Sequence, residues 1–254
     1  MRLPDKAAVL LALALALAAP CAAEKLDLAE LDGFEDAQLL DEPAAWTYPI
    51  AYELLTTSDY IQLVNRDNLL EADFVPADLV KDLSCRKVSY DKIQLRETAA
   101  EALCSLFDGA KEDGIYLYAH SGYRSYQTQK TMYNNRLNRL GRDDGIVQYP
   151  GASEHQSGLA IDVINKAGIG KKFTNDAFAS SKEGKWLAEH CWDYGFILRY
   201  PKDKEEITGI SYESWHLRYV GVQAAQYMRD EGLCLEEFTA QWKEAAAAYE
   251  AAGR

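Results

Sequence analysis

Residues 153–163 read SEHQSGLAIDV and join a polar turn to the start of a strand. In LAIDV, the alternation of a strand places Leu, Ile and Val on one face and Asp162 on the opposite face. The Ser-Gly pair that ends at Gly158 is typical of a turn, which can bring His155 back toward Asp162. We therefore expect an apolar strand face in the core and a His-Asp pair at a cleft on the other face.

A third residue of the same chemistry, His216, lies far downstream in the segment ESWH. Two imidazoles and the Asp162 carboxylate form a zinc ligand set that leaves one coordination position for water, as in catalytic sites. Glu213 opens the same segment and is a candidate proton acceptor for that water. On a regular strand Glu213 and His216 face opposite sides, so this role requires a bend or bulge near Ser214. From the residues alone, the alternative is that these His and Asp side chains are structural or solvated.

The rest of the chain mixes helical and strand patterns in no regular order. Strands are short and rich in β-branched and aromatic residues, and several helical segments end at a glycine. Because regular βαβ alternation is absent, the pattern predicts an α+β fold with a small, mainly antiparallel sheet flanked by helices. Helices are expected over residues 95–114, 125–141, 183–194 and from 222 onward, and strands over residues 115–120, 159–165, 196–201 and 212–221.

The composition is that of a globular, acidic protein. The 254 residues are 48% hydrophobic and carry a formal net charge of -13, which argues against a nucleic-acid partner because phosphate binding needs a basic face. One domain is expected over residues 62–245, and we expect it to be a monomer. An acidic, solvated lead-in at residues 24–61 precedes it, and a tail at residues 246–254 follows.

Residues 1–23 have the composition of an export signal. Arg2 and Lys6 precede a run made almost entirely of Leu and Ala, and small residues then offer a cleavage site before Glu24. The run is shorter than the roughly 20 apolar residues that span a bilayer. We expect a secreted or cell-surface protein without an integral membrane domain; an uncleaved anchor is the alternative.

Four cysteines remain once the signal, with Cys21, is removed. An even number in an exported protein predicts disulfides, and the alternative is four buried thiols. Proximity in the sequence favours the pairs Cys85–Cys104 and Cys191–Cys234.

The segments SGYRSYQTQ, SEHQSGLAIDV, GFILRYP and YESWHLRYVG occur in an order that resembles the VanY-type zinc D-alanyl-D-alanine carboxypeptidases. That family belongs to the lysostaphin/D-Ala-D-Ala-carboxypeptidase/Hedgehog group of folds, and the resemblance covers roughly residues 62–240. It implies that His155, Asp162 and His216 hold one zinc ion per chain and that Glu213 is the catalytic base.

The same resemblance assigns roles to three further polar residues. Arg124 matches a family arginine that faces the substrate, which implies both a catalytic and a substrate-binding role. From the residues alone, Arg124 is an ordinary surface arginine. Gln129 and Ser153 match residues that line the pocket for the terminal D-amino acid. Without the resemblance they read as a helix-surface and a turn residue.

The resemblance implies a zinc carboxypeptidase that removes the C-terminal D-alanine from peptidoglycan stem peptides. An L,D-carboxypeptidase acting on tetrapeptide stems uses the same zinc centre, so these motifs leave that alternative open. A zinc-binding module that has lost catalysis is a second alternative, against which the intact Glu213 argues. A non-haem iron oxygenase also uses two His and one carboxylate, but it typically has a shorter His-Asp spacing.

Overall fold

The computed structural model describes residues 59–88, 92–170 and 175–251. These ranges belong to one compact unit, Pro49–Arg254. The expected export signal and nearly all of the acidic lead-in lie outside the described residues. What the structure describes is therefore the domain expected from residue 62 onward.

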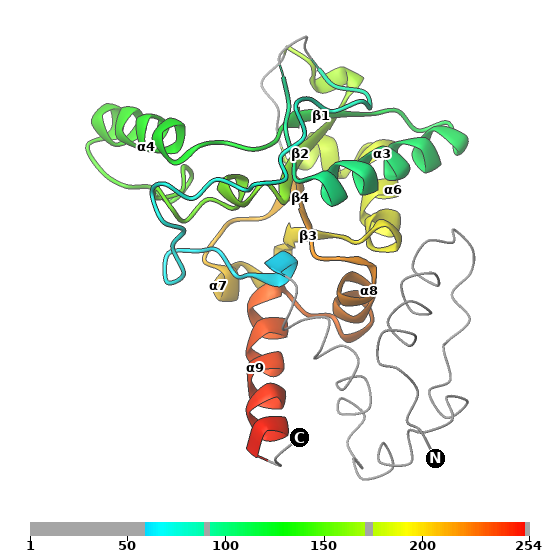
Figure 1. Cartoon of the computed structure of the whole chain (residues 1–254). Coiled ribbons are helices and arrows are strands. Elements are labelled where there is room, and N and C mark those ends of the chain that lie inside the picture. Colours follow the sequence, from blue (N-terminus) through cyan, green and yellow to red (C-terminus); the bar gives the residue numbers. More distant parts are fainter. Residues whose placement is uncertain (1–58, 89–91, 171–174, 252–254) are drawn as a thin grey trace, which may run out of the picture. The chain divides into compact units, whose positions relative to one another are not determined.

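Strands paired antiparallel in the order β1-β2-β4-β3 form the centre of this domain (Figure 1). The helices follow no βαβ alternation, so the predicted α+β class is confirmed. The strands are β1 (Leu117–Ser121), β2 (Ala160–Asn165), β3 (Phe196–Tyr200) and β4 (Glu213–Tyr219).

Helices and short 3-10 turns connect and surround the strands. The α-helices are α3 (Glu97–Glu112), α4 (Tyr126–Leu140), α5 (Asn175–Ala179), α6 (Lys182–His190), α7 (Glu205–Thr208), α8 (Val222–Glu231) and α9 (Leu235–Ala251). The 3-10 turns are η3 (Asp59–Ile61), η4 (Glu154–Ser157), η5 (Lys166–Gly168), η6 (Cys191–Tyr194) and η7 (Lys202–Lys204).

Two hydrophobic clusters pack the sheet against helices. The first joins the buried side chains of α3 to the sheet and includes Leu159, Ile161 and Val163, as the LAIDV pattern predicts. The second joins α8 and α9 to Ile197. Phe196 belongs to the first cluster although it precedes Ile197 on β3, because successive strand residues point to opposite faces.

Strand β4 is irregular where the segment ESWH lies. Leu198 pairs with Leu217 and Tyr200 pairs with Glu213, so two steps along β3 correspond to four steps along β4. Extra residues on one strand bend it and re-aim its side chains. The bend expected near Ser214 is therefore confirmed, and it brings the carboxylate and the imidazole of ESWH to the same side.

One helix boundary differs from that expected from the sequence. Helix α6 ends at His190 and continues as the 3-10 turn η6. The indole Nε1 of Trp192 donates a 2.9 Å hydrogen bond to the Ala188 carbonyl, which satisfies an acceptor that the helix end leaves free. Helix α9 runs on to Ala251, so the Ala-rich end, which the sequence predicts as a surface helix or a frayed tail, is helical to that residue.

Cys85, Cys104, Cys191 and Cys234 are all free thiols in the structure. Cys85 and Cys104 are neighbours: a hydrogen bond between their sulfurs lowers the pKa of Cys104 to about 6 and raises the pKa of Cys85. Cys191 and Cys234 are both buried. The two disulfides stay predictions, and the contact between the first pair is compatible with one of them.

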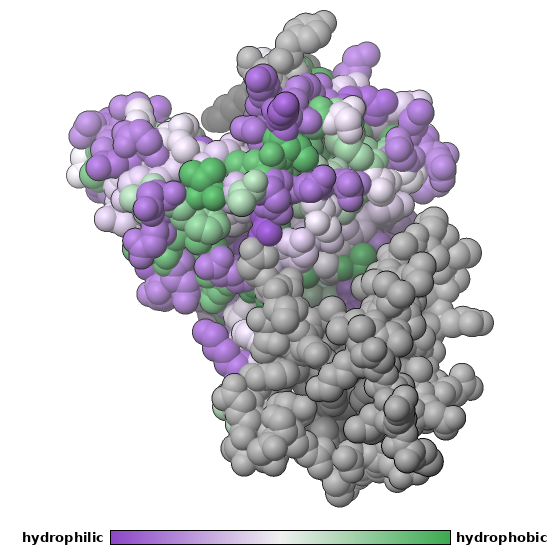
Figure 2. All heavy atoms as spheres, in the orientation of Figure 1, coloured by the Kyte–Doolittle hydropathy of each residue, from purple (hydrophilic) through white to green (hydrophobic). Residues whose placement is uncertain are grey.

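The described surface is mixed in character. Figure 2 shows hydrophilic side chains around a patch of hydrophobic ones on the face in view. Within the described ranges, the structure contains no helix that combines the length and the apolar character needed to cross a bilayer.

The turn at Gly158 yields a stability prediction. Gly158 has a φ of +70°, and an added Cβ would lie 2.9 Å from Leu79 Cδ2; Gly141 has the same φ but open space around it. We expect Gly141→Ala to lower the free energy of unfolding by about 1–2 kcal/mol through the left-handed backbone alone. Gly158→Ala adds an overpacking cost of about 1–3 kcal/mol. Urea denaturation of the two variants measures the difference, and equal losses would contradict the packing at Gly158.

Candidate metal centre

Residues from three separate elements converge at one point. His155 lies in η4, Asp162 on β2 and His216 on β4, and the last two are a cross-strand pair. Each of the three offers one ligand atom, and these atoms lie within 4.8 Å of one another. The structure thus brings together the three residues that the sequence predicts as metal ligands.

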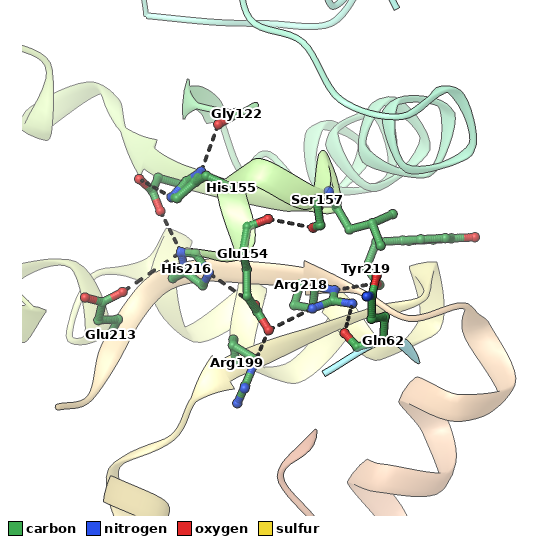
Figure 3. Close-up of polar contacts among 12 residues, drawn as sticks. Gln62, Gly122, Glu154, His155, Ser157, Arg199, Glu213, His216, Arg218 and Tyr219 are labelled. Atoms are coloured by element: carbon green, nitrogen blue, oxygen red, sulfur yellow. Dashed lines mark hydrogen bonds and ion pairs between the residues drawn. The ribbon is translucent and has the colours of Figure 1, made fainter. Parts of the chain in front are cut away.

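The ring of His155 is oriented by a backbone carbonyl. Its Nδ1 lies 2.8 Å from the Gly122 oxygen, which can only accept a hydrogen bond (Figure 3). Nδ1 therefore carries the proton, and Nε2, 3.5 Å from Asp162 Oδ2, is free to act as the ligand atom. Gly122 itself packs closely against the backbone of Gln94. A Cβ at position 122 would lie 2.4 Å from the carbonyl oxygen of Gln94, so this position requires glycine.

The ring of His216 presents its other nitrogen to the site. Its Nδ1 lies 2.9 Å from Asp162 Oδ1, and its Nε2 points away, 3.6 Å from Glu154 Oε2 (Figure 3). The ring of Tyr200 stacks on it, with the two centroids 5.1 Å apart. The two histidines therefore offer different nitrogens, Nε2 from His155 and Nδ1 from His216.

The ionisation of these groups suits a cation. Burial opposes the charged form of Asp162, but its interactions with His155 and His216 outweigh burial and hold the pKa of Asp162 well below its usual range. Burial lowers the pKa of His155 and thereby favours its neutral, ligating form. For His216, the interactions with the Asp162 and Glu154 carboxylates outweigh burial and raise the pKa to about 9. A metal at Nδ1 of His216 must therefore displace a proton.

This donor set fits zinc. Two imidazole nitrogens and one carboxylate are ligands that zinc takes in hydrolytic enzymes, with a position left for water. The two rings lie edge to face, with their centroids 5.1 Å apart. Two of the three side chains come from paired strands of the sheet, and the third from a short 3-10 turn.

Glu213 lies beside the ligands at the start of β4. Its Oε2 is 3.9 Å from His216 Nδ1. Burial raises the pKa of Glu213, an effect that Asp162 reinforces and that His216 and Arg124 oppose. A carboxylate whose pKa is raised toward the working pH is suited to accept a proton and return it.

Arg124 lies next to the same charges. Burial lowers its pKa, whereas Asp162 and Glu213 raise it. Its backbone N–H donates to the His155 carbonyl at 3.1 Å, which ties its position to the metal centre. One guanidinium nitrogen, Nη1, donates to Gln129 Oε1 at 3.0 Å.

The two remaining predicted residues are buried. Gln129 is 1% exposed, and its Nε2 donates to the Gln148 carbonyl while its Oε1 accepts from Arg124. With both ends of its amide engaged, Gln129 holds the arginine in place. Ser153 is buried and immediately precedes η4, where its hydroxyl makes no capping hydrogen bond. The pocket roles of both residues stay predictions.

Glu154 and Tyr200 contact the ring of His216 but are not among the site residues expected from the sequence. Glu154 immediately precedes His155, and nothing in SEHQ distinguishes it from a surface glutamate. Tyr200 is one of 16 tyrosines. The sequence signal is weak in both cases because the contacts arise only when η4 and β3 pack against β4.

Comparisons with known proteins agree with this geometry. The family model described as VanY, D-alanyl-D-alanine carboxypeptidase, matches residues 92–222, which include every predicted site residue. A D-alanyl-D-alanine carboxypeptidase of Enterococcus faecalis is 37% identical over 188 residues, which are 69% of this chain and 64% of that protein. The match thus spans less than two thirds of the length of this relative.

Two solved structures share both fold and sequence with the chain. The LD-carboxypeptidase LdcB is 43% identical with a TM-score of 0.66, and the alignment covers 70% of this chain and 84% of LdcB. The second structure is a variant of the vancomycin-resistance D,D-pentapeptidase VanY from a VanB-type cassette, in complex with Zn(II). It is 34% identical with a TM-score of 0.55, and the alignment covers 71% of this chain and 98% of that VanY chain. The chain therefore belongs to the VanY family of D-alanyl-D-alanine carboxypeptidases.

Proposed function

We propose that the chain is a zinc-dependent carboxypeptidase that removes the terminal D-alanine from peptidoglycan stem peptides. The observation that carries the proposal is the convergence of His155, Asp162 and His216 within 4.8 Å, with the Glu213 carboxylate 3.9 Å from one of them. The family match and the Zn(II)-bound VanY relative support it. One zinc ion per chain is proposed.

The residues of this chain take distinct parts in the hydrolysis. When bound, zinc supplies a Lewis acid that polarises the scissile carbonyl and lowers the pKa of water. Glu213 removes a proton from the attacking water and returns it to the leaving amine. Arg124 binds the terminal carboxylate of the peptide or stabilises the oxyanion that forms at the scissile carbonyl.

The proposal is tested with stem peptides of defined length. Zinc-loaded protein is incubated with pentapeptides ending in D-Ala-D-Ala and with tetrapeptides ending in a single D-Ala, and the products are identified by mass spectrometry. We expect loss of one terminal alanine from the pentapeptide, abolished by a chelator and restored by zinc. An intact pentapeptide beside a shortened tetrapeptide would contradict the D,D assignment.

That second outcome defines the rival activity, L,D-carboxypeptidase. The observation that favours it is the similarity to LdcB, whose TM-score and identity exceed those of the zinc-bound VanY. The metal ligands and Glu213 serve both activities equally, because both cleave an amide bond next to a terminal D-alanine. Cleavage of neither peptide by zinc-loaded protein would instead favour a module that binds without catalysis.

Arg124→Lys is expected to lower kcat/KM by about 10- to 100-fold, because lysine keeps the charge but loses the bidentate geometry, worth about 1.5–3 kcal/mol. Zinc content is expected to stay unchanged, since Arg124 is not among the ligands. Steady-state kinetics measures the effect, with Arg139→Lys on the exposed end of α4 as the matched control. A kcat/KM equal to that of the control would show that Arg124 takes no part in substrate binding or catalysis.

We further propose that the protein works outside the cytoplasm, where its peptidoglycan substrate is found. The composition of residues 1–23 supports this. Comparison of the mass of the exported protein with that of the full chain distinguishes cleavage before Glu24 from an uncleaved anchor.

A further inference from the structure

Behind the metal centre lies a cluster of four charged residues, of which three are fully buried: Glu154, Arg199, Arg218 and the less buried Glu236. The side chains of the first three have no exposed surface, and that of Glu236 is 14% exposed. Arg199 bridges Glu154 and Glu236, with hydrogen bonds of 2.6 to 2.8 Å. Arg218 donates to Glu154 at 2.7 Å and to the carbonyls of Tyr60 and Gln62.

The two carboxylate oxygens of Glu154 face different neighbours (Figure 3). Oε1 accepts from both arginines, at 2.7 Å each, and so offsets part of their positive charge. Oε2 is fully buried and has no hydrogen-bond partner among the described residues. The nearest basic atom is His216 Nε2, at 3.6 Å, which is buried and likewise lacks a hydrogen-bond partner there.

These two atoms are complementary. If His216 binds a metal through Nδ1, its only proton lies on Nε2, and a buried N–H without an acceptor is costly. Oε2 faces this proton, and an approach of a few tenths of an ångström makes a normal hydrogen bond. The arrangement is that of a carboxylate that fixes the tautomer and the orientation of a metal-binding histidine.

We infer that Glu154 is a positioning residue, which fixes the proton of His216 on Nε2 and so presents Nδ1 to the metal. The inference rests on the proposed zinc site. The two arginines hold Glu154 through Oε1, and Arg199 anchors it further to Glu236 in the first turn of α9. The metal ligand is thereby connected to the C-terminal helix through side chains alone.

The rival explanation is that Glu154 only neutralises Arg199 and Arg218. The ion pairs with the two arginines use Oε1 alone, so this explanation does not account for Oε2 facing His216 Nε2. Glu154→Gln separates the two explanations, because its amide oxygen can still accept from the arginines. Its NH₂ group then faces Nε2 and can only donate, which drives the His216 proton to Nδ1, where it blocks the ligand atom.

The experiment measures zinc affinity of the full chain by competition with a chelating dye. We expect Glu154→Gln to weaken zinc binding by about 10- to 100-fold. Glu236→Gln is the matched control: it removes a carboxylate from the same Arg199 but does not touch His216, so its zinc affinity is expected to equal that of the wild type. Equal affinities for wild type and Glu154→Gln, or equal losses in both variants, would overturn the inference.

A second measurement uses the wild type and does not depend on the folding of a variant. The chain has four histidines, so ¹⁵N-histidine labelling gives a simple spectrum of the zinc-loaded protein. We expect His216 to show a metal-bound Nδ1 and a protonated Nε2 whose proton is shifted downfield by a carboxylate; coordination through Nε2 would overturn the inference. A wild-type chain that binds no zinc would overturn the proposed function as well. If the wild type binds zinc and is active, but Glu154→Gln binds zinc with the same affinity, this inference alone is overturned.

Discussion

Glu213→Gln is expected to lower the turnover of a D-alanine-terminated stem peptide by about 10²- to 10⁴-fold, the usual contribution of a general acid-base residue. Glutamine has nearly the size of glutamate but cannot take a proton from water. Burial raises the pKa of Glu213, which makes the carboxylate a stronger base than an exposed glutamate. The loss is therefore expected in kcat, with little change in KM.

The zinc content of this variant separates a chemical from a structural effect. Glu213 is not among the three ligands that converge, so Glu213→Gln is expected to bind as much zinc as the wild type. Glu206→Gln, on an exposed residue of α7, is the matched control and is expected to keep full turnover. Wild-type turnover in Glu213→Gln would rule out this residue as the base.

His155→Ala is expected to abolish tight zinc binding. The variant removes one of three protein ligands, so its affinity should fall by more than the roughly 10- to 100-fold that follows loss of an outer partner. Peptide hydrolysis is expected to fall with the zinc content. Zinc measured by elemental analysis after dialysis checks the first effect.

His190→Ala provides the matched control for this loss. His190 lies at the end of α6 and stacks on Trp186, with the two ring centroids 4.5 Å apart, so its removal affects local packing and not the metal centre. Its zinc content is expected to match that of the wild type. Equal zinc contents in the two alanine variants would mean that His155 is not a ligand.

Much of the fold could be predicted from the sequence because its patterns are local. The alternation in LAIDV placed Leu159, Ile161 and Val163 in one core cluster, and β2 begins within one residue of the predicted strand. Helix α4 ends at Leu140, just before the glycine expected to stop it. The end of α6 was not predictable in this way, because the Trp192 side chain satisfies a helix carbonyl there, a contact that no local pattern indicates.

The metal ligands could be predicted from residue chemistry together with a family resemblance, whereas their surroundings could not. Two imidazoles and one carboxylate are typical zinc ligands, so the residue types alone predict that the side chains of His155, Asp162 and His216 converge. Glu154 acquires its role only when β3 and β4 bring two arginines against it. That arrangement depends on the pairing of two strands that are separate in the sequence, so no periodic sequence pattern predicts it.

The predicted role of Gln129 illustrates a third case. The resemblance places this residue in the substrate pocket, while the structure gives its amide two internal partners, Arg124 and the Gln148 carbonyl. A sequence pattern identifies a residue near a site but does not distinguish contact with substrate from support of a neighbour. The hydrogen bonds of the folded chain show that Gln129 supports Arg124, and its role in the substrate pocket stays a prediction.

The most direct test of the metal centre is anomalous diffraction from crystals of the zinc-loaded chain, recorded on both sides of the zinc absorption edge. We predict one strong peak at about 2.0–2.2 Å from His155 Nε2, a carboxylate oxygen of Asp162 and His216 Nδ1. A zinc peak at any other position, or none between these three residues, would contradict the account.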